Sequence, residues 1–213
     1  LSEQMKVQVQ RDGKIYEISF ERGKTFAPLK VIGETDTTGT RVWFKPDAEI
    51  FEELDYSFDT LKQRLRELAY LNKGLMITIS DERTGDNKEY HFEGGIISFV
   101  EHLNRNKDVL HPKPIFIAGT KDTTMVEVSI QYNDSYIENM LTFVNNINTQ
   151  EGGTHLSGFK SALTRTINDY SRKMNILKEA DDNLSGEDTR EGLTAVISLK
   201  IQEPQFEGQT KSK

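Results

Sequence analysis

The residue types that most often perform catalysis or bind metals are present in this sequence, but their spacing matches no common catalytic motif. The four histidines are His91, His102, His111 and His155. They lack the i, i+4 or His-x-His spacing that brings two imidazole nitrogens to one metal ion. The sequence has no cysteine, no Gly-x-Ser-x-Gly elbow and no Gly-x-x-x-x-Gly-Lys-Ser/Thr phosphate loop. We therefore predict no metal site in this stretch.

The polar segment that closes the sequence, Gln205-Phe-Glu-Gly-Gln-Thr-Lys-Ser-Lys213, contains residue types suited to a phosphate group. A lysine ammonium and a glutamine amide can both donate hydrogen bonds to phosphate oxygens. Taken alone, Gln209 and Lys211 are expected to be solvated surface residues, because lysines in polar segments are mostly exposed. Their role therefore depends on the surrounding sequence.

Composition limits the class of protein. The chain has 213 residues, is 35% hydrophobic and carries a formal charge of −7. No uninterrupted apolar stretch is long enough for a membrane span, so we expect a soluble protein without membrane contact. The absence of cysteine fits a reducing cytosol, and we expect a cytoplasmic location. The acidic balance argues against a dedicated nucleic-acid-binding domain, although local basic patches are compatible with it. The first residues show neither a signal nor a transit pattern, and we expect the chain to begin within a longer protein.

The first half of the sequence alternates between strand and helix patterns. Residues 7–9 and 16–20 form two alternating runs joined by Asp12-Gly13, which predicts a β-hairpin. A Gly-, Pro- and Thr-rich segment predicted as a loop leads to a strand at 41–45 in the same antiparallel sheet. Apolar residues spaced by three and four predict a helix from Phe58 to about Asn72. A second hairpin is expected over residues 75–92.

The second half begins with Glu93-Gly94-Gly95, where we predict a domain boundary. A helix with Ile96 and Phe99 on one face follows, and then strands near 115–117, 126–132 and 140–144. The longest helix is predicted to start with Thr154 as N-cap, with an apolar stripe that continues to Met174. An alternating strand at 195–201 precedes the polar end, and Asp188 and Arg190 are expected to be structural, as a possible ion pair.

Several longer strings give a more specific indication. They are Val31-Ile-Gly-Glu-Thr-Asp-Thr-Thr-Gly-Thr40, Leu65-Arg-Glu-Leu-Ala-Tyr-Leu-Asn72, Glu151-Gly-Gly-Thr-His155, Ala162-Leu-Thr-Arg-Thr-Ile-Asn168, Asp188-Thr-Arg-Glu-Gly-Leu-Thr-Ala-Val-Ile-Ser198 and Pro204-Gln-Phe-Glu-Gly-Gln-Thr-Lys211. In order and spacing they closely resemble the B subunits of bacterial DNA gyrases, which are type II topoisomerases. The resemblance covers the chain from end to end.

This resemblance implies an α/β (α+β) fold with two domains. Residues 1–92 would be the C-terminal part of a GHKL (Bergerat) ATPase domain, an α/β sandwich. Residues 93–213 would be a transducer domain similar to domain 2 of ribosomal protein S5. The family uses ATP and Mg²⁺, and its partners are DNA, the gyrase A subunit and a second B subunit in a homodimeric clamp.

The resemblance also assigns roles to individual residues. Lys211 would contact the γ-phosphate of ATP as a sensor, and Gln209 would bind the same end of the nucleotide. Gly39 and Thr40 match a position that joins the network around the adenine ring. Arg11 matches an arginine at the mouth of the nucleotide pocket that aminocoumarin inhibitors contact, and Val42 lines the same wall. Taken alone, each of these residues would be assigned to an ordinary strand or surface position.

Two residues of the longest helix are expected to face DNA. Lys160 matches a position where gyrases often have an arginine that faces the central DNA cavity, and Arg165 adds charge to the same helix. Lysine keeps the charge but loses the planar hydrogen-bonding geometry of arginine. Arg172 and Lys173 are also basic, but their spacing alone does not distinguish the cavity from open solvent.

The resemblance leaves alternatives. The general base, the magnesium ligand and the ATP lid of the family would precede residue 1, so this stretch alone is expected to be inactive. The B subunit of topoisomerase IV is the nearest alternative, although the short Gln202-Glu203-Pro204 link favours gyrase. A less favoured interpretation is a non-enzymatic S5-like module that binds RNA or protein, in which Lys211 would meet no phosphate.

Overall fold

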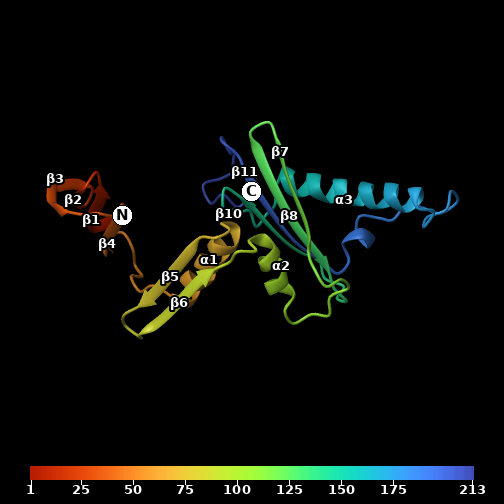
Figure 1. The fold of residues 1–213 in the computed structure, drawn as a ribbon, viewed down its shortest axis with the longest axis horizontal. Coiled ribbons are helices and arrows are strands. Elements are labelled where there is room, and N and C mark those ends of the chain that lie inside the picture. Colours follow the sequence, from red (N-terminus) through yellow and green to blue (C-terminus); the bar gives the residue numbers. More distant parts are fainter. The chain divides into compact units, whose positions relative to one another are not determined.

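The computed structural model describes residues 1–213 and consists of two compact units, Leu1–Ser57 and Phe58–Lys213 (Figure 1). The first unit contains only strands and the second contains helices and strands. The chain as a whole is therefore α/β, as predicted. The expected domain boundary after Phe92 lies inside the second unit. There, the Tyr70 ring stacks on the rings of Phe92 and Phe99, with centroid distances of 3.7 and 4.7 Å. The assignment of residues 1–92 and 93–213 to two domains remains a prediction.

The first unit is one antiparallel sheet. Its strands are β1 (Ser2–Arg11), β2 (Lys14–Glu21), β3 (Lys24–Glu34) and β4 (Gly39–Pro46), in the order β3-β2-β1-β4. The predicted Asp12-Gly13 hairpin is confirmed, with φ of 51° and 75° at the two turn residues. Positive φ at both positions gives a turn whose twist matches that of the flanking strands.

The strand β3 was not expected from the sequence. The loop predicted after Phe20 is wrong, because Arg22-Gly23 forms a second turn with φ of 45° and 81° and the chain returns along β2. The β2–β3 register shifts at several points, which interrupts the period-two pattern that marks a strand. Pro28 also lies in β3, and proline is tolerated there because β3 is an edge strand.

The second unit contains two sheets and three α-helices. Its elements are α1 (Phe58–Leu71), β5 (Met76–Asp81), β6 (Asp86–His91), α2 (Ile96–Asn104), β7 (Ile115–Lys121), β8 (Thr124–Tyr132), β9 (Asn139–Val144), β10 (Ile147–Asn148), α3 (Thr154–Lys173), a 3₁₀ turn η1 (Asp188–Arg190) and β11 (Leu193–Lys200). The main sheet has the order β10-β9-β11-β8-β7, and β5 and β6 form a hairpin. The pair β9–β11 is parallel and the other pairs are antiparallel.

The core of the second unit lies on both faces of β11. Side chains of β8 and β11, including Val128 and Ile197, pack against Leu156 and Phe159 of α3. On the other face, Val196 packs in a cluster with residues of α1 and α2. Because β11 is covered on both sides, its residues are buried from Leu193 to Leu199. The sheet therefore separates α3 from the pair α1 and α2.

The start and the stripe of α3 differ in part from the prediction. Gly153, with φ of 147°, is the N-cap, and Thr154 is the first helical residue. The predicted cap is therefore wrong by one residue, because glycine takes the unusual backbone angle more easily. The first half of the apolar stripe packs on the sheet, whereas Tyr170 and Met174 are 57% and 54% exposed.

Candidate functional site

The C-terminal loop, residues 205–213, is closed on itself by hydrogen bonds. The Glu207 N–H donates to the Lys213 carbonyl at 2.8 Å, and the Lys211 N–H donates to the Gly208 carbonyl at 3.0 Å. The Lys213 ammonium lies 3.0 Å from the Glu207 carboxylate. The polar end of the chain therefore has a defined conformation.

Lys211 occupies an unusual position in this loop. Its backbone has φ of 56°, in the left-handed region that few residues other than glycine adopt. Its ammonium lies 5.7 Å from the centre of the Phe206 ring and pairs with no carboxylate. The Gln209 side chain is exposed beside it. A free cation and a free amide on one polar loop suit the terminal phosphate of a nucleotide.

The loop is also attached to the segment before α3. The Glu151 N–H donates to the Ser212 carbonyl at 2.9 Å, and the Ser212 hydroxyl donates to the Glu151 carboxylate at 3.0 Å. Glu151 belongs to one of the strings that resemble gyrase B, but no contact with the C-terminal loop was expected for it, and it is 61 residues from Ser212. No local pattern signals a contact between residues so far apart.

The expected adenine-side residues lie at one end of the first sheet. Thr40 pairs with Val9, and Val42 pairs with Val7. Because side chains alternate along a strand, Thr40, Val42 and Arg11 lie on the same face, and Gly39 lies on the other. Arg11 has only an exposed contact of 3.6 Å with Asp12. Its guanidinium is therefore largely free.

The structure brings the predicted residues together in two separate groups. Arg11, Gly39, Thr40 and Val42 belong to the unit Leu1–Ser57, and Gln209 and Lys211 belong to the unit Phe58–Lys213. Each group is ordered within its own unit. Their union in one nucleotide pocket remains a prediction.

Lys160 and Arg165 line an open cavity of about 660 Å³ beside α3. Lys160 is not a free cation, because its Nζ lies 2.5 Å from Oε1 of Glu138. The other oxygen of Glu138 lies 2.8 Å from Nε of Arg190. One carboxylate thus holds two cations at the edge of the cavity. Arg165 forms no ion pair, so no carboxylate neutralises its guanidinium.

The charge cluster also corrects one expectation. The prediction of an ion pair between Asp188 and Arg190 is wrong. Arg190 pairs with Glu138, and the Asp188 carboxylate accepts the Ser185 N–H at 2.7 Å. Hydrogen bonds from Ser185 hold the pKa of Asp188 below its usual value. Partial burial raises the pKa of Glu138, but hydrogen bonds from Lys160 and Arg190 lower it more, so the net pKa is below the usual value.

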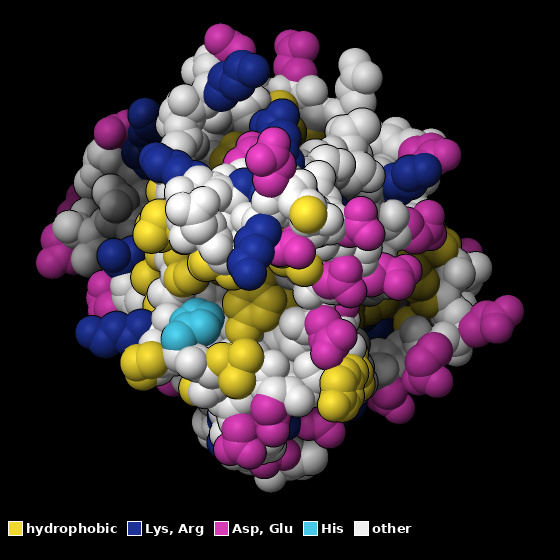
Figure 2. Space-filling view, turned by 90° about the vertical axis from the view of Figure 1, so that its right-hand side faces the viewer, with side chains coloured by type: hydrophobic (Ala, Val, Ile, Leu, Met, Phe, Trp, Pro, Cys, Tyr) yellow, Lys and Arg dark blue, Asp and Glu magenta, His cyan; other side chains and the backbone are white.

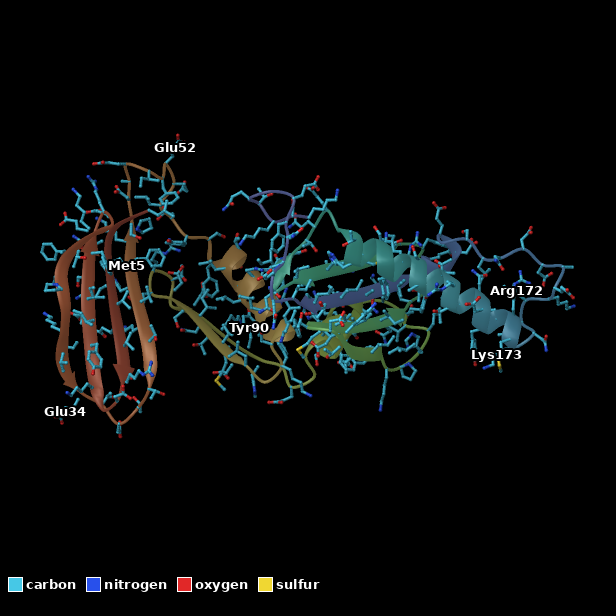
Figure 3. All side chains as sticks on the ribbon, turned by 90° about the horizontal axis from the view of Figure 1, so that it is seen from above. Met5, Glu34, Glu52, Tyr90, Arg172 and Lys173 are labelled. Atoms are coloured by element: carbon cyan, nitrogen blue, oxygen red, sulfur yellow. The ribbon has the colours of Figure 1, made fainter.

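Arg172 and Lys173 lie at the C-terminal end of α3 (Figure 3). The Arg172 guanidinium donates to the carbonyls of Lys178 and Asp181, at 2.9 and 2.8 Å, and to the Asn183 amide oxygen. Arg172 therefore holds the loop that follows the helix. Its role is structural, a point that its charge and spacing left open.

No cluster of three or more His, Asp or Glu side chains in residues 1–213 is arranged to hold a metal ion. None of the helices combines the length and apolar character that a membrane span requires.

Comparison with known families supports the resemblance. The family model described as DNA gyrase B matches residues 95–213. The DNA gyrase B subunit of Clostridium acetobutylicum is 57% identical over the whole chain, and that of Enterococcus faecalis is 59% identical. The chain spans only 34% of the length of each of these relatives.

Solved structures of gyrase B and of topoisomerase IV are both similar to this chain. The 43K ATPase domain of Thermus thermophilus gyrase B, in complex with an aminocoumarin, is 43% identical with a TM-score of 0.87. The match covers 98% of this chain and 57% of that one. The topoisomerase IV ATP-binding domain of Francisella tularensis, in complex with a small-molecule inhibitor, is 30% identical with a TM-score of 0.82. That match covers all of this chain and 58% of the other.

Proposed function

The chain belongs to the DNA gyrase B family, and we propose that it forms part of the B subunit of an ATP-dependent type II topoisomerase that negatively supercoils DNA by double-strand passage. The identity of 57% over the whole chain carries this proposal. In it, residues 1–92 complete a GHKL ATPase domain and residues 93–213 form the transducer domain. The chain couples the nucleotide state to closure of a homodimeric clamp on DNA.

Lys211 is the proposed γ-phosphate sensor, and Gln209 binds the same phosphate. An ammonium group that contacts the terminal phosphate binds ATP more tightly than ADP, so hydrolysis weakens a contact between the two domains. The absence of an ion pair at Lys211 supports this role, because its charge is not already neutralised. Binding therefore requires no existing salt bridge to break.

The first sheet supplies the proposed wall of the nucleotide pocket. Thr40 and Val42 share a face with Arg11, which suits a pocket lined by that face. Val42 is 52% exposed and no residue of Leu1–Ser57 belongs to a buried hydrophobic core. An apolar sheet face of this kind is stabilised when another layer covers it. We assign that layer to a further segment of the longer protein.

ATP supplies the phosphoryl group whose presence Lys211 detects. No group of three or more His, Asp or Glu side chains in residues 1–213 could hold a metal ion. Following the resemblance to gyrase B subunits, we assign the magnesium ligands and the general base to other parts of the longer subunit. The 213-residue chain alone is expected to show no ATP turnover.

Lys160 and Arg165 are the proposed contacts with DNA. Both lie on α3 at one cavity, where cations meet the phosphate backbone without reading its sequence. The other proposed partners are the gyrase A subunit and aminocoumarin-type inhibitors, and the proposed location is the cytoplasm.

A supercoiling assay tests this function. The subunit, extended to the length of its relatives, is combined with its A subunit, relaxed circular DNA and ATP. We expect ATP-dependent negative supercoils. Efficient decatenation without supercoiling would favour topoisomerase IV, to whose Francisella tularensis ATP-binding domain the fold is also similar. Absence of both activities would contradict the proposal and favour a binding module.

A further inference from the structure

A second basic surface lies on the opposite side of the main sheet from Lys160 and Arg165. It is a cavity of about 950 Å³ between α1, α2 and the β9–β10 hairpin, which we call the α1–α2 groove. Its basic side chains are Arg64, Arg66, His102, Arg105 and Lys107. Glu67 is the only acidic residue that lines it.

The cations of the groove differ in whether they pair with a carboxylate. Arg64 is occupied, because it lies 2.9 Å from the Glu67 carboxylate and donates to the Asn146 carbonyl. Arg66 and Lys107 form no ion pair. Arg105 donates to a ring nitrogen of His102 at 2.8 Å, so it too has no acidic partner. Three cations thus remain without a counter-charge.

The groove is basic although the chain as a whole is acidic. The chain carries 34 acidic and 27 basic residues, and acidic side chains spread over the right-hand and lower parts of the face in Figure 2. Burial lowers the pKa of His102, and the positive charges of Arg66 and Arg105 lower it further. Mutual repulsion of unpaired cations costs stability, and an anionic ligand removes that cost.

We propose that the α1–α2 groove binds the phosphate backbone of DNA, as a contact separate from Lys160 and Arg165. The proposal rests on the function proposed above. The three free cations come from two elements, since Arg66 is on α1 and the other two follow α2. The groove is far larger than one inorganic phosphate, so an extended polyanion fits it better than a single ion. The amides of Asn148 and Gln150 add neutral donors to the same lining.

The salt dependence of DNA binding tests this site. Binding of the 213-residue chain to a fluorescent duplex is followed by anisotropy at several salt concentrations, for the wild type and for Arg66→Ala/Lys107→Ala. Each lost phosphate contact is expected to flatten the slope of log K against log salt by about 0.9. The double variant should therefore lose about 1.8 from the slope. The matched control, Lys121→Ala/Lys200→Ala, removes the same charge from exposed positions and should lose less than half as much.

Three further measurements are needed to interpret the change in slope. Circular dichroism shows whether the double variant folds, and Arg66→Lys/Lys107→Arg, which keeps both charges, should retain the wild-type slope. Equal slopes for the double variant and its control would overturn the proposal. The proposal would also be overturned if polyglutamate or inorganic phosphate competed as strongly as unlabelled duplex. Competition by polyglutamate would indicate an acidic protein as the ligand, and competition by phosphate would indicate a free anion. Either result would overturn only the proposal for the groove, because the supercoiling assay tests the proposed function separately.

Discussion

Glu151 and Ser212 are joined by two hydrogen bonds, one through the backbone at 2.9 Å and one through the side chains at 3.0 Å. Lys211 immediately precedes Ser212, and Glu151 lies three residues before the first residue of α3. The position of the proposed phosphate sensor is therefore fixed relative to the helix that carries Lys160 and Arg165. A change at Lys211 has a short covalent and hydrogen-bonded route to α3.

Loss of the Glu151 side chain should weaken nucleotide binding without touching the nucleotide. In the longer subunit we expect Glu151→Ala to lower the affinity for a non-hydrolysable ATP analogue by about fivefold, since one exposed hydrogen bond contributes about 1 kcal/mol. Glu151→Gln keeps the acceptor oxygen and should bind almost as the wild type does. Calorimetric titration measures both. Equal losses in the two variants would contradict a positioning role.

Glu138 restrains two cations, and its neutralisation should strengthen DNA binding. Glu138→Gln leaves Lys160 and Arg190 without a carboxylate partner, so both become available to phosphates. We expect a steeper salt dependence, by about 0.9 for each cation that gains a phosphate contact. Anisotropy with duplex DNA measures this slope. Weaker binding by Glu138→Gln would show that the carboxylate instead positions the cations for DNA.

The same carboxylate gives a pH dependence. Its pKa in the folded chain is below the usual value, so the ion cluster stabilises the fold fully above the unfolded pKa of about 4.3. This stabilisation is lost as the pH falls through the lower folded pKa. As the pH falls from 5 toward the acid limit, the free energy of unfolding, measured in urea, should therefore decrease more for the wild type than for Glu138→Gln. Parallel pH profiles of unfolding free energy for the two proteins would contradict the lowered pKa of Glu138.

Gly192 is required at the start of β11. Its φ is 69°, and a Cβ there would overlap the carbonyl oxygens of Asn133 and Ser135. We expect Gly192→Ala to lower the free energy of unfolding by about 3 kcal/mol, from backbone strain and steric overlap together. Gly158 on α3 has open space around it, so Gly158→Ala should raise stability by about 0.5 kcal/mol. Urea denaturation of both variants tests the contrast.

Local patterns in the sequence predicted most of the elements. Asp12-Gly13 identified the first hairpin because its turn type demands positive φ, and the alternation of Ala195, Ile197 and Leu199 identified β11. The strand β3 was missed because its bulges and Pro28 break the period of two. The helical period of α3 was predicted correctly. Periodicity does not show how far the sheet extends along the helix, so the exposure of Tyr170 and Met174 was not predicted.

The site was less predictable, because its contacts depend on topology. Glu138 and Arg190 are 52 residues apart and meet only because β9 lies beside β11 in the sheet. Nothing near Glu138 in the sequence signals two cationic partners. The proposed roles of Lys211 and Arg11 rest on resemblance, since a lysine in a polar loop and an arginine beside a turn are ordinary surface residues.

The central claim is that Lys211 senses the γ-phosphate of ATP. Its most direct test is calorimetric titration of the longer subunit with a non-hydrolysable ATP analogue and with ADP, in the wild type, in Lys211→Ala and in the control Lys213→Ala. We predict that Lys211→Ala lowers affinity for the analogue about tenfold or more, because a charge-assisted hydrogen bond contributes about 1.5–3 kcal/mol. Affinity for ADP should stay the same, and Lys213→Ala should bind both as the wild type does. Unchanged affinity of Lys211→Ala for the analogue would contradict the claim.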